Sequence, residues 1–340
     1  MKKILVTGGL GFIGSHTVVE LQNEGYKVVI IDDLSNSTIE VLQGIISITG
    51  NIPEFEKLDL KDKLSVESFF AKHDDINGVI HFAASKAVGE SVEQPLLYYE
   101  NNINTLVYVL KSVLQLKTSN FIFSSSCTVY GQADEMPITE NAPVKPAESP
   151  YGNTKQIGEE IIRDTCRISN KFQAIALRYF NPIGAHSSAK IGELPIGIPQ
   201  NLVPFITQTA AGLRECLSVF GNDYPTPDRT CIRDYIHVVD LAKAHVVALK
   251  RLIENKNESN FETFNIGTGV GSSVLDVIKS FEKVSGKSLN YKFAPRRDGD
   301  VISAYANTDK ANNILGWKAQ STLDEAVNSA WQWEKRIRNL

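Results

Sequence analysis

Near its start the chain reads Ile4-Leu5-Val6-Thr7-Gly8-Gly9-Leu10-Gly11-Phe12-Ile13-Gly14. Three aliphatic residues in a row are typical of a short strand that is buried on both faces of a parallel sheet. A glycine turn follows, with glycines at 8, 11 and 14, and residues 12–21 are compatible with a helix. A strand that leads through such a turn into a helix presents free backbone N–H groups, where a pyrophosphate can dock. This segment therefore predicts a dinucleotide-binding unit.

A pair of carboxylates ends the second predicted strand. Residues 27–31 are apolar after Lys27, and Asp32 and Asp33 follow them directly. A carboxylate about 20 residues beyond the glycines hydrogen-bonds the 2′-hydroxyl of the adenine ribose and repels a 2′-phosphate. The two residues therefore predict NAD as the cofactor in preference to NADP. The alternative is a solvated strand end, which the upstream glycines make less attractive.

Strand-like and helix-like segments alternate along the first half of the chain. Further strands are predicted near residues 55–59, 78–83, 121–123 and 174–180, and helices near 38–48, 62–71, around 98–110 and from 151 onward. This βαβ order predicts an α/β fold with a Rossmann-type doubly wound parallel sheet and a smaller C-terminal substrate domain. We expect an NAD-binding domain over residues 1–180 and a substrate-binding domain over 181–340. A helix at 238–252 and a strand at 262–266 predict that a segment of about 236–268 returns to the main sheet, whereas 191–204 is rich in Pro and Gly.

The composition is that of an ordinary globular protein, with 340 residues, 42% hydrophobic and 22% charged. A net charge of −4 argues against a broad nucleic-acid surface. No apolar run is long enough to span a membrane, and the first residues do not resemble a signal peptide, so no membrane association is expected. The four cysteines show no metal-binding spacing, which predicts reduced thiols, a cytoplasmic location and no metal site; they are Cys127, Cys166, Cys216 and Cys231.

A candidate catalytic group follows the fifth predicted strand. Tyr151 and Lys155 lie one helical turn apart on the same face of a predicted helix. The pKa of a tyrosine is ordinarily near 10, and the Lys155 ammonium, together with the positive nicotinamide ring of NAD⁺, would lower it toward the working pH. Ser124-Ser125-Ser126 ends the strand, at the edge where a cofactor would lie, and one hydroxyl there can bond the reacting oxygen. This constellation predicts hydride transfer at an alcohol, the alternative being an ordinary surface pair on a helix.

Two arginines in separate loops of the second half are candidates for substrate binding. The guanidinium groups of Arg233 and Arg297 are suited to the oxygens of a diphosphate, which they bind in a bidentate fashion. The alternatives are surface solvation or ion pairs with Asp234 and Asp300. His81 and His237 are interpreted as structural.

Over essentially its whole length the chain resembles the extended short-chain dehydrogenase/reductase group and, within it, the UDP-galactose (UDP-glucose) 4-epimerases. Eight blocks in order carry the resemblance: Val6–Gly9 through Gly14–Thr17, His81–Ala83, Lys86–Ser91, Phe123–Ser126, Ser149–Gly152, Arg178–Pro182, Arg233–His237 and Pro295–Asp300. The resemblance implies a homodimeric enzyme that interconverts UDP-glucose and UDP-galactose through a transient 4-keto sugar.

The resemblance also implies a role for individual residues. Tyr151 would be the base and acid at the sugar 4-hydroxyl, Lys155 its electrostatic partner, and Ser126 a hydrogen-bond partner of the 4-oxygen. The implied cofactor positions are Gly8, Gly11, Phe12, Ile13, Gly14, Asp32, Asp33, Asn36, Ser37, Asp59, Leu60, Phe82, Ala83, Lys86, Asn101, Tyr151, Lys155 and Phe180. The implied substrate positions are Lys86, Ser126, Tyr151, Tyr179, Asn181, Asn201, Leu202, Phe220, Arg233, Tyr235, Arg297, Asp300 and Ala304. The chain departs from the family pattern at Asp33, Cys127 and Ala84-Ser85.

The position of Ala304 bears on which sugars fit. In the resembling family, the residue at this position borders the sugar pocket, and a bulky tyrosine there restricts the enzyme to plain hexoses. Alanine predicts that UDP-GlcNAc and UDP-GalNAc are also interconverted, because the N-acetyl group is no longer excluded sterically. In the alternative interpretation, Ala304 only packs beneath Tyr305.

Other activities on the same scaffold stay open. A nucleotide-sugar 4,6-dehydratase would need extra acid and base groups to eliminate water. The family resemblance places these as an Asp-Glu pair after the serine position, where this chain has Cys127-Thr128. A simple NAD-dependent sugar dehydrogenase would release NADH in stoichiometric amounts. A non-catalytic NAD-sensing module is a third alternative, from a different class.

Overall fold

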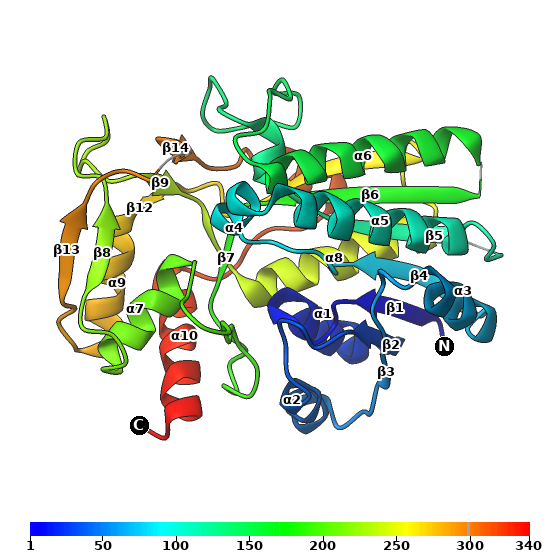
Figure 1. Cartoon of the computed structure of the whole chain (residues 1–340), viewed down its shortest axis with the longest axis horizontal. Helices are drawn as coiled ribbons and strands as arrows, with labels where there is room; N and C mark the ends of the chain where they lie inside the picture. Colours follow the sequence, from blue (N-terminus) through cyan, green and yellow to red (C-terminus); the bar gives the residue numbers. More distant parts are fainter. Residues whose placement is uncertain (118, 170, 298–299) are drawn as a thin grey trace.

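A parallel seven-stranded sheet forms the centre of the larger part of the molecule (Figure 1). The computed structural model describes residues 1–117, 119–169, 171–297 and 300–340. The strands are β1 (Lys3–Thr7), β2 (Lys27–Asp32), β3 (Glu54–Lys57), β4 (Ile76–His81), β5 (Ser119–Ser126), β6 (Phe172–Tyr179) and β11 (Phe261–Ile266). They are arranged in the order β3-β2-β1-β4-β5-β6-β11, which reverses direction between β1 and β4. This is the doubly wound Rossmann arrangement, so the predicted fold class is confirmed.

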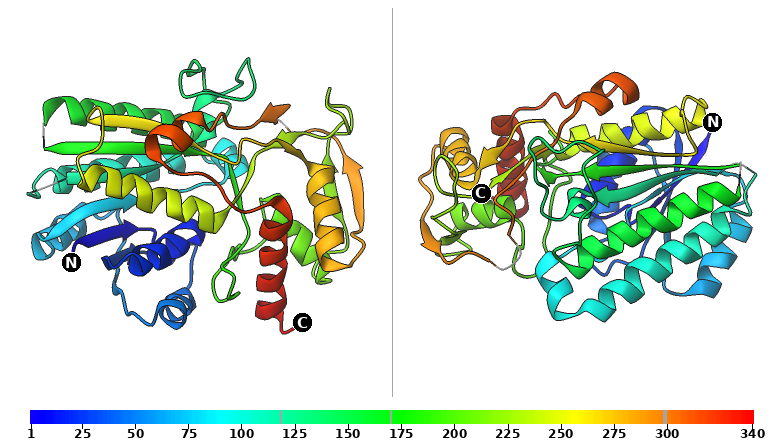
Figure 2. Two further views of the ribbon diagram at one scale, coloured as in Figure 1. Left: turned by 180° about the vertical axis from the view of Figure 1, so that it is seen from behind. Right: turned by 90° about the horizontal axis from the view of Figure 1, so that it is seen from above.

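Helices cover both faces of this sheet (Figure 2). On one face lie α1 (Phe12–Asn23), α2 (Glu40–Thr49) and α8 (Val238–Ile253), and on the other α3 (Lys63–Lys72), α5 (Pro95–Val113) and α6 (Pro150–Ile168). Successive strand residues point to opposite faces, so Ile4 and Val6 join the first hydrophobic cluster and Leu5 joins the second. All three are fully buried. This two-sided burial explains why the strands are continuous apolar runs.

The smaller part of the molecule is built from helices and short strands (Figure 1). Its helices are α7 (Leu202–Ala210), α9 (Val274–Ser285) and α10 (Leu323–Arg338), and its strands are β7 (Asn181–Ile183), β8 (Leu217–Phe220), β9 (Ile232–Arg233), β10 (Tyr235–His237), β12 (Ser272–Ser273), β13 (Tyr291–Ala294) and β14 (Ser303–Ala304). Ile206, Phe281 and Val327 are fully buried in the core that joins the three helices. The remaining elements are α4 (Val88–Glu93), the 3-10 turn η1 (Cys127–Tyr130) and the π turn η2 (Ala311–Leu315). No described helix is long and apolar enough to cross a membrane.

The start of α6 is fixed by its local sequence. The Ser149 hydroxyl accepts a hydrogen bond from the backbone N–H of Gly152 at 3.2 Å, and Pro150 occupies the first helical position. Both features favour a helix N-terminus at this point. Tyr151 and Lys155 consequently lie in the first two turns of α6, beside the end of β5.

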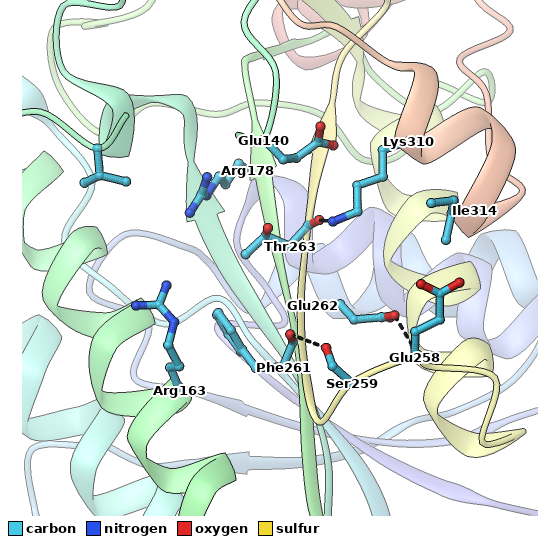
Figure 3. A pocket seen from close by; sticks show the side chains of 11 residues that line it. Glu140, Arg163, Arg178, Glu258, Ser259, Phe261, Glu262, Thr263, Lys310 and Ile314 are labelled. Carbon is cyan, nitrogen blue, oxygen red and sulfur yellow. Dashed lines mark hydrogen bonds between the residues drawn. The ribbon is translucent and has the colours of Figure 1, made fainter. Parts of the chain in front are cut away.

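The outer edge of the sheet is closed by charged side chains. Lys310 Nζ donates to the backbone oxygen of Thr263 in β11 at 2.8 Å, and a Glu140 carboxylate oxygen accepts from the backbone N–H of Asn265 at 2.8 Å. Such contacts protect an edge strand from pairing with another chain. A cavity of about 630 Å³ lies beside this edge (Figure 3), and its described lining includes no residue that the sequence predicts for the site.

Candidate active site

The predicted dinucleotide turn joins β1 to α1. Gly8 has a φ of +67°, and a Cβ atom there would lie 2.9 Å from the backbone nitrogen of Ala83. A Cβ at Gly14 would lie 2.2 Å from the Gly8 oxygen, so the helix can pack this closely against the turn only with glycine. Gly11 is the N-cap of α1, and no side chain of the described residues caps this end. The first-turn N–H groups are thus available to a pyrophosphate, and the turn fits a dinucleotide.

Asp32 is held rigidly at the end of β2. The residue is 7% exposed, and its carboxylate accepts hydrogen bonds from the backbone N–H groups of Leu10 and Leu34, each at 3.0 Å, and from the Ser37 hydroxyl at 2.7 Å. The neighbouring Asp33 accepts from the backbone N–H and hydroxyl of Ser35. The contact with Leu10 places the Asp32 carboxylate next to the glycine turn, as an adenine ribose would require, and Asp33 follows it directly in the chain.

Most other predicted cofactor residues follow the carboxyl ends of the parallel strands. Phe12 and Ile13 open α1, Asn36 and Ser37 follow β2, Asp59 and Leu60 follow β3, Phe82, Ala83 and Lys86 follow β4, and Phe180 follows β6. Asn101 belongs to α5, where its side-chain amide donates to the Ser85 hydroxyl at 2.8 Å. This edge of a doubly wound sheet forms the ligand crevice where the strand order reverses. The arrangement fits a dinucleotide.

The structure brings Ser126, Tyr151 and Lys155 together beside the end of β5. Ser126 is the last residue of β5, and its hydroxyl accepts from the backbone N–H of Thr128 at 3.2 Å. Lys155 Nζ donates to the backbone oxygen of Ser124 at 2.8 Å and lies 5.7 Å from the centre of the Tyr151 ring. Two segments far apart in the sequence thus supply one hydroxyl, one phenol and one ammonium to a common site.

Burial shifts the ionisation of this site. Burial raises the pKa of the Tyr151 phenol, and a hydrogen bond with Ser126 partly opposes that shift. Burial also lowers the pKa of the Lys155 ammonium to about 8. Each shift disfavours the charged form of its group, as expected for a poorly hydrated site. An ionised phenol at this position would therefore need nearby positive charge to stabilise it, which the Lys155 ammonium can supply in part.

The two candidate substrate arginines share one carboxylate. Arg233 lies 3.5 Å from one oxygen of Asp300, and Arg297 Nε donates to the other oxygen at 3.1 Å. The Arg297 guanidinium also lies 4.7 Å from the centre of the Phe220 ring. The ion pairs with Asp300 that the alternative interpretation predicts are thus present, and they bring both guanidinium groups to one place. Asp234 instead accepts backbone hydrogen bonds from Thr268 at 2.8 Å and from other N–H groups.

The remaining predicted substrate residues are spread over neighbouring elements. Asn181 opens β7, Asn201 and Leu202 stand at the start of α7, Phe220 ends β8, Tyr235 opens β10 and Ala304 ends β14. Tyr179 ends β6, and its hydroxyl is hydrogen-bonded to that of Ser124, the residue whose carbonyl oxygen holds Lys155. Ala304 is 8% exposed and pairs with Arg233 across the β9–β14 ladder.

The sequence interpretation missed one residue near the crevice. Glu193 contacts both Lys86 and Asn201, and no local motif marks it. The two histidines taken as structural have structural contacts: His81 is hydrogen-bonded to Thr7 at 2.8 Å, and His237 accepts from the backbone N–H of Val239 at 3.0 Å. Among the described residues, no group of three or more His, Cys, Asp or Glu side chains could hold a metal ion.

The fold and the site define a dinucleotide-binding α/β protein of the extended short-chain dehydrogenase/reductase type. Residues 5–330 match the family model described as GDP-mannose 4,6 dehydratase. A UDP-glucose 4-epimerase of Bacillus subtilis is 50% identical over 97% of this chain and 96% of its own length.

Two solved structures are similar to this chain over nearly their whole length. The UDP-glucose 4-epimerase of Stenotrophomonas maltophila, with bound NAD and formylated UDP-arabinopyranose, is 43% identical with a TM-score of 0.95, covering 100% of this chain and 99% of that one. The enzyme of Bifidobacterium longum, in complex with NAD⁺ and UDP, is 44% identical with a TM-score of 0.94 and 99% coverage of both chains. The chain belongs to the UDP-glucose 4-epimerase family.

Proposed function

We propose that this protein interconverts UDP-glucose and UDP-galactose as an NAD-dependent 4-epimerase. The observation that carries the proposal is the meeting of Ser126, Tyr151 and Lys155 on the same sheet edge as the dinucleotide turn. Curated relatives of this chain are named UDP-glucose 4-epimerase at 47–50% identity, and similar solved structures contain NAD and UDP. The cofactor is NAD, in agreement with the carboxylates at 32 and 33.

The roles of the three side chains follow from their chemistry. NAD, when bound, supplies the acceptor that takes a hydride from C4 of the sugar and returns it to the same carbon. Tyr151 takes the proton of the 4-hydroxyl and gives it back, while the Ser126 hydroxyl holds the 4-oxygen. The Lys155 ammonium favours the ionised phenol, against the raised pKa that burial imposes.

Epimerisation requires that the keto sugar turn while the nucleotide stays bound. Arg233 and Arg297 are the groups we assign to the diphosphate, since guanidinium groups bind phosphate oxygens bidentately. Asp300 keeps the two together. Strong binding of the nucleotide with weak binding of the sugar allows hydride to return to the opposite face of the ring.

The dehydratase alternative lacks its acid and base groups. The position after Ser126 holds Cys127, and burial raises the pKa of its thiol to about 11, so it is neutral at physiological pH and is a poor replacement for a carboxylate. A non-catalytic NAD-sensing module would not need the Ser126 hydroxyl, the Tyr151 phenol and the Lys155 ammonium at one place. A simple dehydrogenase would consume NAD, which the assay below detects.

We also propose activity on 2-acetamido sugars. Ala304 is buried in a cluster that includes Val129 and Phe180, at the end of β14 opposite Arg233. A methyl side chain leaves more room there than a phenol would. If other side chains already fill this space, the alternative interpretation of Ala304 as simple packing holds.

The assay of four UDP-hexoses tests these proposals together. The purified protein, without added dinucleotide, is incubated with UDP-Glc, UDP-Gal, UDP-GlcNAc or UDP-GalNAc, and the products are separated by chromatography. We expect interconversion within each pair and no build-up of reduced cofactor. Turnover of the plain hexoses alone would refute only the acetamido proposal, whereas stoichiometric NADH without epimer would favour a dehydrogenase.

Domain roles, assembly and location complete the proposal. We infer that residues 1–180 bind NAD and 181–340 bind the UDP-sugar, with β11 joining the first part through its pairing with β6.

A homodimer is supported by exposed apolar side chains near the α4–α5 junction, where Val92 is 61% and Leu96 80% exposed. Light scattering in solution tests the dimer. A reducing compartment such as the cytoplasm is supported by the four free cysteines.

A further inference from the structure

Glu193 joins the two parts of the molecule at the crevice. It lies in the loop between β7 and α7, and its Oε1 atom accepts a hydrogen bond from the side-chain amide of Asn201 at 2.6 Å. The same oxygen lies 3.7 Å from Lys86 Nζ. Lys86 belongs to the loop after β4, at the carboxyl edge of the main sheet, so one carboxylate contacts a cation from the first part and an amide from the second.

The carboxylate is placed by a rigid support. Trp333 Nε1 of α10 donates to the backbone oxygen of Glu193 at 2.9 Å. A Cβ at the preceding Gly192 would lie 2.5 Å from the Trp333 ring, so the loop and α10 pack in close contact. The Glu193 side chain is only 10% exposed, although its partner Lys86 is 51% exposed. Glu193 therefore has a defined position and is not a freely moving surface acid.

The contact with Asn201 replaces an ordinary helix cap. Asn201 is the N-cap residue of α7, yet its side chain makes no capping hydrogen bond and instead donates to Glu193. Asparagine is among the preferred capping residues, so a strong partner is needed to draw its side chain away. A charge-assisted hydrogen bond to a carboxylate is such a partner.

The charge of Glu193 is unexpected at a crevice for anionic nucleotides. An isolated carboxylate would repel a diphosphate, but here it lies against the Lys86 ammonium and holds that side chain and Asn201 within reach of one another. Lys86 stands at the edge where ligands bind in doubly wound sheets, and Asn201 stands at the start of α7 in the smaller part.

We propose that Glu193 is a positioning residue for nucleotide-sugar binding, which fixes Lys86 and Asn201 across the crevice. The inference rests on the proposed function, because it assumes that the crevice between these loops receives a UDP-sugar. Glu193 acts through its two neighbours and not on the reacting carbon. Its loss should therefore weaken binding and leave the chemical step nearly unchanged.

The test compares Glu193→Ala and Glu193→Gln with the wild-type holoenzyme. KM and kcat are measured with UDP-galactose, the Kd of UDP by titration calorimetry, and NAD content after denaturation. We expect Glu193→Ala to raise KM and the UDP Kd about tenfold, the effect of losing one hydrogen bond to a charged group, with kcat nearly unchanged. Glu193→Gln keeps an acceptor for Asn201 but loses the charge, so we expect an intermediate increase.

The matched control is Glu67→Gln, which breaks an exposed Lys–Glu pair on α3 with a distance of 3.5 Å to Lys63. This variant should bind UDP as the wild type does. The proposal is overturned if Glu193→Ala binds UDP as tightly as the control, or if kcat falls while KM and the UDP Kd do not change. Failure of the wild type to epimerise UDP-galactose would refute the proposed function separately, since the UDP Kd is measured without turnover.

Discussion

Lys155 Nζ lies 5.7 Å from the centre of the Tyr151 ring and donates to the backbone oxygen of Ser124 at 2.8 Å. The ammonium is thus anchored to the strand that also carries Ser126, and it faces the tyrosine across one helical turn. Burial raises the pKa of Tyr151, which favours its neutral phenol, whereas Lys155, whose pKa burial lowers to about 8, stays largely protonated at neutral pH.

Tyr151→Phe should lower the rate of epimerisation by at least about 10²-fold, because it removes the general base and keeps the ring. The far-ultraviolet circular dichroism and the bound NAD should be retained. Tyr26→Phe, at the opposite end of the sheet before β2, is the control and should retain wild-type activity. Near-normal activity of Tyr151→Phe would show that another group takes the proton.

Lys155 should make the stability of the cofactor-free protein depend on pH. Burial lowers its pKa from 10.5 to about 8, so between these values the unfolded chain holds a proton that the folded chain has lost. The free energy of unfolding contributed by this group therefore rises as the pH increases from 8 toward 10.5. In urea titrations, the free energy of unfolding of the wild type should therefore rise relative to that of Lys155→Met over this pH range. The exposed Lys111→Met is the control, and parallel curves for wild type and Lys155→Met would contradict the shift.

The purified protein should carry NAD and not NADP. Asp32 and Asp33 would face a 2′-phosphate with like charge, whereas they can accept from ribose hydroxyls. The nucleotide released by denaturation is identified by chromatography and mass spectrometry. A predominance of NADP would mean that another group neutralises the two carboxylates.

Ala304→Tyr should abolish turnover of UDP-GlcNAc and leave UDP-galactose epimerisation largely intact, because the phenol fills the space that we assign to the N-acetyl group. Ala304→Ser adds little volume and should keep both activities. Initial rates with the two substrates are the measurement. If the unmodified protein ignores UDP-GlcNAc at concentrations that saturate with UDP-glucose, Ala304 does not act as the gate.

Local features of the sequence were sufficient to predict the sheet and the dinucleotide turn. The strand–glycine–helix segment is contiguous, so Gly8 and Gly14 could be interpreted without knowledge of distant contacts. The predicted fifth strand, 121–123, is too short, because the three serines that end it do not continue the apolar run. In the structure β5 runs to Ser126, and the serine hydroxyls are buried with partners, Ser125 donating to Glu159 at 2.6 Å.

Contacts between distant segments could not be predicted in this way. Glu193 joins Lys86 to Asn201 through contacts that follow only from the folded chain. The sequence indicates Asp300 as an ion-pair partner of the arginines, but only the fold shows that it joins Arg233 to Arg297. The Pro and Gly content of residues 191–204 predicts loop over this segment, yet α7 begins at Leu202. Pro204 is tolerated there because the first turn of a helix does not need its N–H.

The most direct test of the account is to follow a deuterium label through one turnover. UDP-galactose labelled with deuterium at C4 is incubated with the purified protein, without added dinucleotide, and the product is examined by NMR and mass spectrometry. If hydride leaves C4 and returns to the same carbon within the site, UDP-glucose should form with the deuterium retained at C4. Loss of the label to solvent, or accumulation of reduced dinucleotide without UDP-glucose, would contradict the account.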